Sequence, residues 1–387
     1  MYRSRTCCFP LLMLFVLLSF PHHVHGASIH GAAIKVALLS PDDSKFWQMV
    51  AGFSEAVADD LGIELTVHTD HKRNRFSYRT LLASVLARDD KPDYVIFMAK
   101  EMVTGNMLQM AGQAGVKVLT FNTDIPESES DALGDPRVTM PHWIGHVAPD
   151  NRLAGKQLAD FLLAAAKSLS RDATKERWGA IALSGTHDSS AAKDRDLGLE
   201  DALADNTLQL YQLVYANWNE QEAADKTRRL IKRYSNPDIV WSTSDGMALG
   251  AIEALEKGGL TPGVDVVVGG IDWEPRALEA IHEGKLSVSL GRHFMGGGLT
   301  LLLLHDYHNG YDFAGSPDNS LRYQFEIASR ENLTQIKKVL KPENWRTVDF
   351  RRLSPVYNPA IRNNRLSANQ LMDQFISQLV VARDAPE

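Results

Sequence analysis

The chain contains very little cysteine, only Cys7 and Cys8 among its 387 residues. Both lie near the N-terminus, so the rest of the chain must be held together by its core without disulfides. Positive charge is also scarce, because 41 Lys and Arg stand against 48 Asp and Glu, a net charge of −7. That balance opposes binding to nucleic acid or to an anionic membrane, which needs a basic surface.

Long hydrophobic runs are absent except near the N-terminus. There Arg3 and Arg5 precede a short apolar run at residues 9–20, and small residues at 24–26 offer a cleavage site. This pattern predicts a secretory signal peptide of residues 1–26, cleaved near Gly26. The alternative, a membrane-anchoring helix, is disfavoured because the run is short and interrupted by Pro10. We therefore expect an exported, soluble mature chain.

The remaining sequence alternates apolar strand-like runs with helical patterns, which is typical of doubly wound α/β architecture. One such unit occupies about residues 34–125, and residues 126–149 read as an irregular crossover rich in Pro, Asp and Ser. A second unit begins with the helical pattern of residues 151–168. A late strand-like run at residues 325–327 indicates that the chain crosses between the two units more than twice.

We predict two doubly wound, Rossmann-like α/β lobes joined by a hinge. Residues 354–387 lie beyond this plan and form a C-terminal extension, in which apolar residues at four-residue spacing predict an amphipathic helix. We expect that helix to pack on its own lobe rather than on a partner. The predicted boundaries are residues 34–146, completed by about 294–320, for the N-terminal lobe and 147–293, completed by about 321–353, for the C-terminal lobe.

Polar and aromatic residues stand just after the predicted strands, where ligands bind in doubly wound sheets. Rings suit the C–H faces of a sugar, carboxylates and amides accept hydroxyl protons, and guanidinium groups donate to hydroxyl oxygens. The collection therefore predicts a small, neutral polyhydroxylated ligand held between the lobes. The predicted ligand-binding residues are Ser44, Phe46, Trp47, Asn122, Arg195, Trp218, Ser244, Asp245, Asp272 and Arg292.

Each of these residues also has a structural interpretation. Trp47 could be a core ring, Asp245 could be only a helix N-cap, and Arg195 could be a solvated surface charge. Asn122 and Asp272 could be ordinary turn residues. The argument for a ligand site rests on their joint occurrence at successive strand ends.

Catalytic and metal sites are less well supported. His305 and His308 have helical spacing but no third ligand nearby, so we expect them on an exposed helix face. Asp245 and Asp272 could be the carboxylate pair of a glycosidase, but binding proteins use carboxylates for the same hydroxyls. No nucleophile elbow or Walker A loop occurs in the sequence. We therefore predict no catalytic residues, no metal and no cofactor.

Two segments, residues 242–255 and residues 266–272, make the chain similar to type I periplasmic binding proteins of the ribose-binding and autoinducer-2-binding group. The resemblance covers about residues 34–345. It implies that Ser244 and Asp272 hold ligand hydroxyls, that Arg195 grips the ligand and that Phe46 and Trp47 form the aromatic pair of the first loop. It also implies that Trp218 supplies a stacking ring in the second lobe.

The sequence departs from the sugar-binding pattern at two loops, where it carries Asn122-Thr123 and Arg292. Asn122, Arg195, Ser244-Asp245 and Arg292, with Ser44 and Trp47, resemble the autoinducer-2-binding pattern instead. However, Ile271-Asp272 stands where that protein has a tryptophan after its glycine-ended strand. The ligand therefore stays open between a monosaccharide and an autoinducer-2-like furanose.

The resemblance implies a monomeric periplasmic protein that closes around its ligand by a hinge motion and delivers it to an inner-membrane ABC permease. A ligand-sensing subunit for a membrane histidine kinase is an open alternative, because no short motif separates transport from sensing. An exported glycoside hydrolase is the competing enzyme class. The role of the extension, residues 354–387, is also open.

Overall fold

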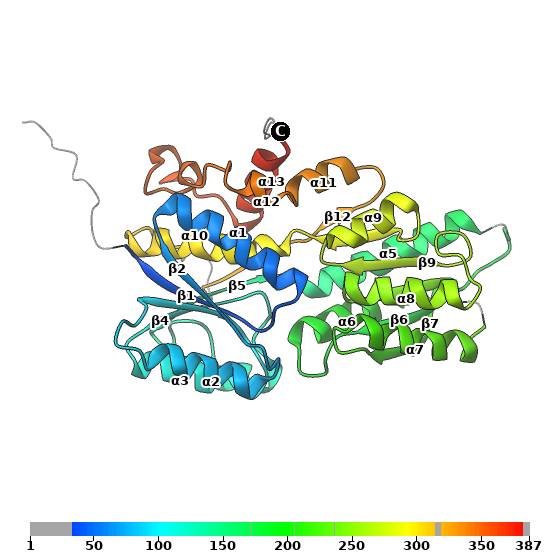
Figure 1. The fold of residues 1–387 in the computed structure, drawn as a ribbon, viewed down its shortest axis with the longest axis horizontal. Helices are drawn as coiled ribbons and strands as arrows, with labels where there is room; N and C mark the ends of the chain where they lie inside the picture. The colour runs from blue at the N-terminus through cyan, green and yellow to red at the C-terminus, as the bar shows by residue number, and fades with distance from the viewer. Residues whose placement is uncertain (1–32, 171, 205, 236, 314–318, 382–387) are drawn as a thin grey trace, which may run out of the picture. The chain divides into compact units, whose positions relative to one another are not determined.

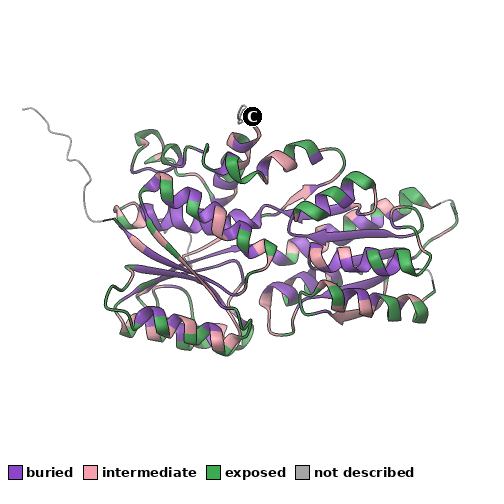
Figure 2. Cartoon of the chain, viewed as in Figure 1, coloured by how far each residue is buried: buried purple, intermediate pink, exposed green. Residues whose placement is uncertain are grey.

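The first of two β-sheets contains six strands in the order β11-β5-β4-β3-β1-β2, all paired in parallel (Figure 1). Its inner strands are apolar and largely buried (Figure 2), and β3 is buried along its whole length. The strand bounds are β1 Lys35–Ser40, β2 Glu64–Thr69, β3 Tyr94–Met98, β4 Lys117–Phe121, β5 Trp143–Pro149 and β11 Ser320–Tyr323.

The second sheet repeats this arrangement in the order β12-β10-β9-β8-β6-β7, with only β12 antiparallel to its neighbour. Both sheets belong to one unit of the chain, residues 34–387. The strand bounds are β6 Trp178–Ser184, β7 Leu208–Tyr215, β8 Ile239–Ser242, β9 Val267–Ile271, β10 Val288–Gly291 and β12 Glu326–Ala328.

The computed structural model describes residues 33–381 except 171, 205, 236 and 314–318. The predicted signal peptide and both cysteines lie outside the described residues. Among the helices that are described, none is long and apolar enough to cross a membrane.

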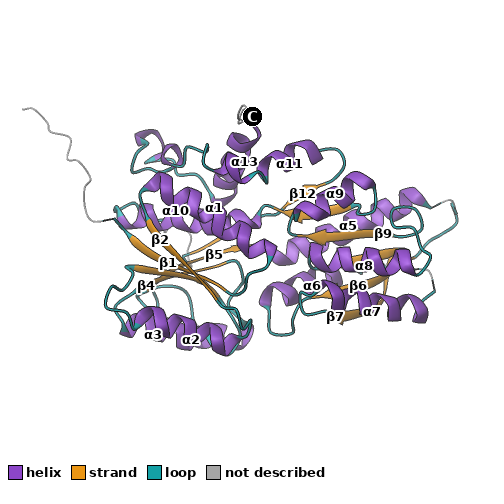
Figure 3. Ribbon diagram, viewed as in Figure 1, coloured by secondary structure: helices purple, strands orange, loops and turns teal. Residues whose placement is uncertain are grey.

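Helices cover both faces of each sheet, as expected for doubly wound lobes (Figure 3). In the first lobe α1 packs against α10 on one face, and α2 packs against α3 on the other. In the second lobe α5 packs against α6, and α7 against α8. The bounds are α1 Lys45–Leu61, α2 Arg75–Leu86, α3 Thr104–Gln113, α4 Glu127–Leu133, α5 Asn151–Leu169, α6 Ser190–Ala202, α7 Glu220–Arg233, α8 Asp245–Lys257, α9 Pro275–Glu283 and α10 Gly296–His308.

Helices α1 and α10 approach closely because α10 begins with three glycines. A Cβ atom on Gly298 would lie 2.6 Å from Cδ1 of Phe53, and one on Gly297 would lie 2.4 Å from the hydroxyl of Ser54. Real Cβ atoms do not come this close to other atoms, so the glycines are required for packing between the helices.

Three segments connect the lobes. The chain passes from β5 into α5 at Asp150, from β10 into α10 through a short 3₁₀ helix at His293–Met295, and from β11 into β12 at residues 324–325. The prediction of more than two crossings is therefore confirmed. The prediction of an irregular crossover at residues 126–149 is wrong, because this segment contains α4 and β5, and β11 was not predicted either.

The C-terminal part of the chain from residue 333 to residue 381, which includes the described part of the predicted extension, packs against both lobes (Figure 1). Helix α11 contacts α9 of the second lobe, whereas α12 contacts α1 and α13 contacts α10 and β11 of the first. The apolar stripe of α13 is buried through Leu371, Met372, Phe375 and Leu379. The bounds are α11 Leu333–Val339, α12 Pro342–Trp345 and α13 Ala368–Val381.

Candidate functional site

A cavity of about 260 Å³ lies where the carboxyl ends of strands from both sheets meet. Its volume is close to the lower end of the range of about 300–1,000 Å³ typical for small-molecule sites, which suits a ligand with a single ring. Eight of the ten predicted ligand-binding residues line it: Ser44, Phe46, Trp47, Asn122, Arg195, Trp218, Ser244 and Asp272. Asp245 and Arg292 do not.

The first lobe contributes two aromatic rings from the start of α1. The Phe46 ring stacks on the imidazole of His293, with centroids 4.5 Å apart and an interplanar angle of 26°. Trp47 meets Phe46 and Phe121 edge-on and is only 7% exposed. Trp47 is therefore a core ring that also lines the cavity. The structural and the ligand-binding interpretations of Trp47 are compatible.

Trp218 forms part of the wall from the second lobe. It follows β7 in a left-handed backbone conformation, with φ of 56°, and is 38% exposed. A Cβ on Gly185 would lie 2.0 Å from this indole ring, so the ring rests directly on the Gly185 backbone. The guanidinium of Arg195 lies 6.0 Å from the ring centroid, within cation–π range.

Arg195 is a buried residue of α6, not a solvated surface charge. Its Nε donates to Oδ1 of Asn151 at 2.9 Å, and its Nη1 donates to the backbone carbonyl of Thr243 at 2.6 Å. Its Nη2 lies 3.5 Å from Nε2 of His293. These partners fix the guanidinium at the cavity wall, where a planar set of donors suits ligand oxygens.

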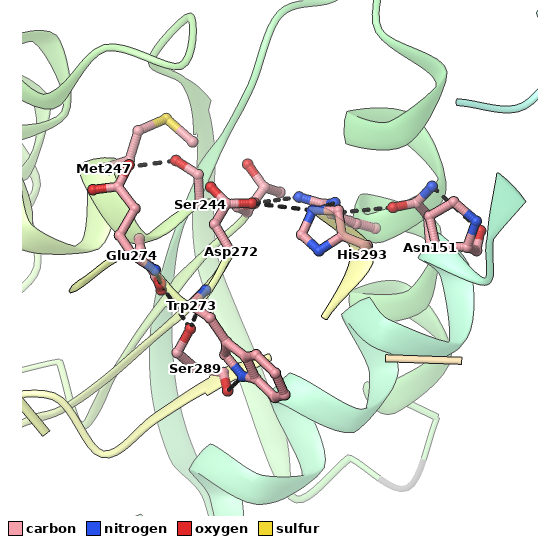
Figure 4. A network of polar contacts seen from close by, with 12 residues as sticks. Asn151, Ser244, Met247, Asp272, Trp273, Glu274, Ser289 and His293 are labelled. Carbon is pink, nitrogen blue, oxygen red and sulfur yellow. Dashed lines mark hydrogen bonds and ion pairs between the residues drawn. The ribbon is translucent and has the colours of Figure 1, made fainter. Parts of the chain in front are cut away.

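Asp272 and His293 form a close pair (Figure 4), and His293 also lies beside Arg195. Nε2 of His293 lies 3.3 Å from Oδ1 of Asp272. Burial raises the pKa of Asp272 to about 7, although the Arg195 charge opposes this rise. Burial and the Arg195 charge together lower the pKa of His293 well below its ordinary value, so the imidazole is neutral.

Asp272 stands at a special backbone position. It follows β9 with φ of 136°, and Trp273 after it has φ of 59°. The Asp272 amide donates to the carbonyl of Leu290 at 2.7 Å, and the indole Nε1 of Trp273 donates to the carbonyl of Ser289 at 3.1 Å. This turn places the Trp273 side chain in the core and the Asp272 side chain at the cavity wall.

The expectation that Asp245 reaches the cavity is corrected by the structure. Its Oδ2 accepts hydrogen bonds from the amide of Glu274 at 2.9 Å and from the hydroxyl of Ser289 at 2.7 Å. Asp245 is fully buried, and burial together with the Asp272 charge raises its pKa well above the ordinary value. Asp245 therefore fixes the loop that carries Asp272 and Glu274, while Ser244, the N-cap of α8, lies at the cavity wall.

The expectation that Arg292 reaches the cavity is corrected as well. Its Nη1 donates to Oδ1 of Asp373 at 2.6 Å, and its Nε donates to the carbonyl of Gln324 at 2.6 Å. Because Arg292 has a φ of 72°, the chain turns sharply and consecutive side chains point apart. Arg292 therefore binds the C-terminal helix, and its neighbour His293 lines the cavity instead.

On the first lobe, Asn122 follows β4 with φ of 69°. Its backbone N–H donates to the carbonyl of Val147 at 2.9 Å, which fixes the start of the loop. Ser44 precedes α1, but its side chain makes no capping hydrogen bond there. Its amide instead donates to Oδ1 of Asp42 at 2.8 Å. Both residues thus present side-chain hydrogen-bonding groups at the cavity wall.

The predicted set of site residues missed six charged or titratable residues that line the cavity: Asp42, Arg73, Lys100, Asp188, Glu274 and His293. Lys100 and Glu274 follow β3 and β9 by two and three positions, so extending the strand-end search by a few residues would have found them. The ammonium of Lys100 lies 5.1 Å from the centroid of the Tyr78 ring. No sequence signal distinguishes His293 from Arg292.

Polar contacts cross between the lobes near the cavity. Arg75 of the first lobe lies 3.2 Å from Asp188 of the second, and Lys193 of the second lies 3.3 Å from Glu101 of the first. The Ser190 hydroxyl also donates to the carbonyl of Asp124 at 2.8 Å. These contacts join the loops that surround the cavity.

The side chains that line the cavity suit the binding of hydroxyl groups. Its rings, carboxylates and guanidinium can hold hydroxyl groups, whereas the part of the chain that the structure describes brings together no cluster of three His, Cys, Asp or Glu residues able to hold a metal. His305 is buried rather than exposed as predicted, because its ring stacks on Tyr357 and its Nδ1 lies 3.3 Å from Asp306.

Comparison with known proteins agrees with this geometry. Residues 34–306 match the family described as periplasmic binding protein domain. The ribose import binding protein of Escherichia coli is 26% identical over 257 residues, 66% of this chain and 77% of that protein. The fructose import binding protein of Bifidobacterium longum is 24% identical over 254 residues, 65% of this chain and 72% of that protein.

A crystal structure of a periplasmic sugar-binding protein from Pseudomonas fluorescens superposes with a TM-score of 0.74 and 31% identity. The match covers 84% of this chain and 95% of that one. The family match spans well over half of the chain, including strands β1–β10 of the two sheets and the cavity-lining loops. The chain therefore belongs to the periplasmic binding protein domain family and has the two-lobed α/β fold of its type I members.

Proposed function

We propose that this protein is a periplasmic solute-binding protein that captures one small polyhydroxylated ligand, a monosaccharide, and delivers it to an ABC transporter of the inner membrane. The observation that carries the proposal is the cavity in which buried Arg195 and Asp272 stand opposite the Phe46 and Trp47 rings. The similarity to ribose and fructose import binding proteins supports both the ligand class and the transport partner.

The position of Arg292 favours a monosaccharide over an autoinducer-2-like furanose. Arg292 is part of the sequence pattern that resembles the autoinducer-2-binding protein, yet its guanidinium is bound to Asp373 and lies away from the cavity. Among the described residues of the second lobe, Arg195 is thus the one arginine that lines the cavity.

In the proposed complex, the cavity residues act without turnover. Arg195 donates to ligand oxygens, Asp272 accepts hydroxyl protons, and Phe46 packs against a C–H face of the sugar ring. A charged hydrogen bond of this kind contributes about 1.5–3 kcal/mol, so a few of them offset the cost of association. Asn122, Ser44, Ser244 and Trp218 complete the wall and orient the ligand.

The experiment is isothermal titration calorimetry of the purified protein with a panel of monosaccharides and myo-inositol. We expect one sugar to bind with 1:1 stoichiometry, and Arg195→Ala to weaken its affinity at least tenfold, because about 1.4 kcal/mol corresponds to a factor of ten. Arg152→Ala is the matched control, because Arg152 is an exposed arginine of α5 paired with Asp201.

Two results contradict the proposal. Unchanged sugar binding by Arg195→Ala would remove Arg195 from the ligand site. Turnover of chromogenic glycosides by the wild-type protein would identify an enzyme instead of a binding protein.

A further inference from the structure

Glu274 is a cavity-lining carboxylate whose charge is poorly compensated by the protein. It stands at the N-cap of α9, three residues after β9, and its side chain is only 13% exposed. Its backbone amide donates to Asp245, but no hydrogen bond reaches its carboxylate from any of the described residues. A buried carboxylate without partners is costly, so this one requires an explanation.

The guanidinium of Arg276 lies near Glu274 but is hydrogen-bonded to Glu220. Nη2 of Arg276 lies 3.8 Å from Oε2 of Glu274, but the same guanidinium forms two shorter contacts with Glu220, at 3.0 and 2.5 Å. The Asp272 charge stands on the same wall of the cavity and repels that of Glu274. Burial and this repulsion raise the pKa of Glu274 to about 7.

Other groups at the cavity indicate that a ligand completes the site. Asn122 is 7% exposed and His293 is 2% exposed, and both line the cavity. Neither Oδ1 of Asn122 nor Nδ1 of His293 has a hydrogen-bond partner within the described part of the chain. Buried polar atoms of this kind are rare unless a bound molecule satisfies them.

The opposite wall does not lack compensation in the same way. Arg73 and Lys100 are the first-lobe cations among the residues that line the cavity, and Arg73 is paired with Asp43. Burial lowers the pKa of Lys100, whereas the charges of Asp188, Asp42 and Asp70 oppose this fall. Both cations therefore have carboxylates close by, whereas the charges of Asp272 and Glu220 repel that of Glu274, which Arg276 and Lys45 offset only in part.

We propose that the ligand is a polyol that carries a protonated amine, and that Glu274 binds this ammonium group. The inference rests on the proposed function, because it names the chemical class of the ligand in the same cavity. An ammonium offers three donors and a positive charge to an acceptor-only carboxylate, which makes a charge-assisted hydrogen bond. A neutral hydroxyl offers one donor and leaves the negative charge uncompensated.

The test is calorimetry at pH 7.0 with matched pairs that differ only in an amine: D-glucosamine with D-glucose, D-galactosamine with D-galactose, and an inosamine with the corresponding inositol. We expect at least one amine to bind at least tenfold more tightly than its hydroxyl counterpart. Glu274→Gln should remove this preference, because a neutral amide carries no charge to attract the ammonium group.

Glu279→Gln is the control, because Glu279 is an exposed residue of the neighbouring helix paired with Lys337 at 2.9 Å. It should leave the preference intact. A preference that survives in Glu274→Gln, or no preference for any amine in the wild-type protein, overturns the inference. Arg195-dependent binding of hydroxyl sugars without amine preference overturns this inference alone, whereas no binding of any polyol contradicts the proposed function too.

Discussion

Nε2 of His293 lies 3.5 Å from Arg195 and 3.3 Å from Asp272 at the cavity wall. Only two of the three can carry charge, because burial and the guanidinium keep the imidazole neutral. The carboxyl of Asp272 is therefore balanced by one cation, Arg195, and burial still raises its pKa to about 7. This arrangement links the ligand site to the stability of the fold.

The pKa of Asp272 predicts a pH-dependent stability difference. Because the pKa of this carboxyl in the folded chain lies above its ordinary value of 3.8, the folded chain holds a proton that the unfolded chain has released between about pH 4 and pH 7. The contribution of this proton to the free energy of unfolding is fully present below about pH 4 and is lost as the pH rises through about 7. Asp272→Asn lacks this titration.

We therefore expect the melting temperature of the ligand-free wild-type protein to fall by several degrees relative to that of Asp272→Asn between pH 5 and pH 8. Differential scanning calorimetry of both proteins measures this. Comparing the two cancels the titration of groups on which the Asp272 charge does not act, such as His68, whose pKa burial lowers. A constant difference across this range would show that the Asp272 carboxyl is not buried as described.

At the scale of single residues, the sequence predicted the cavity where a strand end fixes the position of a side chain. Asn122 and Asp272 follow their strands directly, and both line the cavity. Asp245 and Arg292 were misplaced because their orientation depends on facts outside the local sequence. Asp245 is held in the interior by its hydrogen bond with Ser289. Arg292 is directed away from the cavity by its own left-handed backbone conformation and by its hydrogen bond with Asp373 of α13.

At the scale of elements, the C-terminal helix α13 touches two of the three connections between the lobes. Asp373 and Asn369 accept hydrogen bonds from Arg292, next to the 3₁₀ helix that leads into α10. Oδ1 of Asn369 also accepts from the amide of Gln324, at 2.7 Å, between β11 and β12. The extension therefore stabilises the segments about which a hinge motion would occur.

Removing the carboxylate at residue 373 should destabilise the protein, because Arg292 is buried and would lose its short ion pair. For Asp373→Ala we expect the free energy of unfolding to fall by about 1–3 kcal/mol, the range for a hydrogen bond to a charged group. Urea denaturation measures the change. Gln374→Ala, on the exposed side of the same helix, should change it by less than about 0.5 kcal/mol.

Equal effects of Asp373→Ala and Gln374→Ala would contradict a stabilising role for the contact between Arg292 and Asp373. The experiment requires no ligand, so its result does not depend on the proposed function.

The elements that the sequence predicted are those with strong periodicity. The apolar runs of β1, β3 and β4 and the alternating helices follow directly from the hydrophobic pattern. Strand β5 was missed because Gly145, His146 and Pro149 interrupt its apolar pattern. Strand β11 was missed because it is only four residues long, and its pairing with β5 joins segments far apart in the chain.

At the scale of the whole molecule, both lobes contribute to one cavity, and three connections join them. The cross-lobe pairs Arg75–Asp188 and Lys193–Glu101 lie near the cavity, whereas the contacts of α13 lie at the connections. Under the proposed function, ligand binding between the lobes would be coupled to hinge closure, and a transporter would recognise the closed state. The central claim is thus that a polyol occupies this cavity.

The most direct measurement is a crystal structure of the protein with the polyol that binds most tightly in calorimetry. The account predicts one ligand in the cavity, with its ring against Phe46, its hydroxyl groups bonded to Arg195 and Asp272, and any amine against Glu274. A ligand bound elsewhere, or bound in the cavity without contact to Arg195 and Asp272, would contradict it.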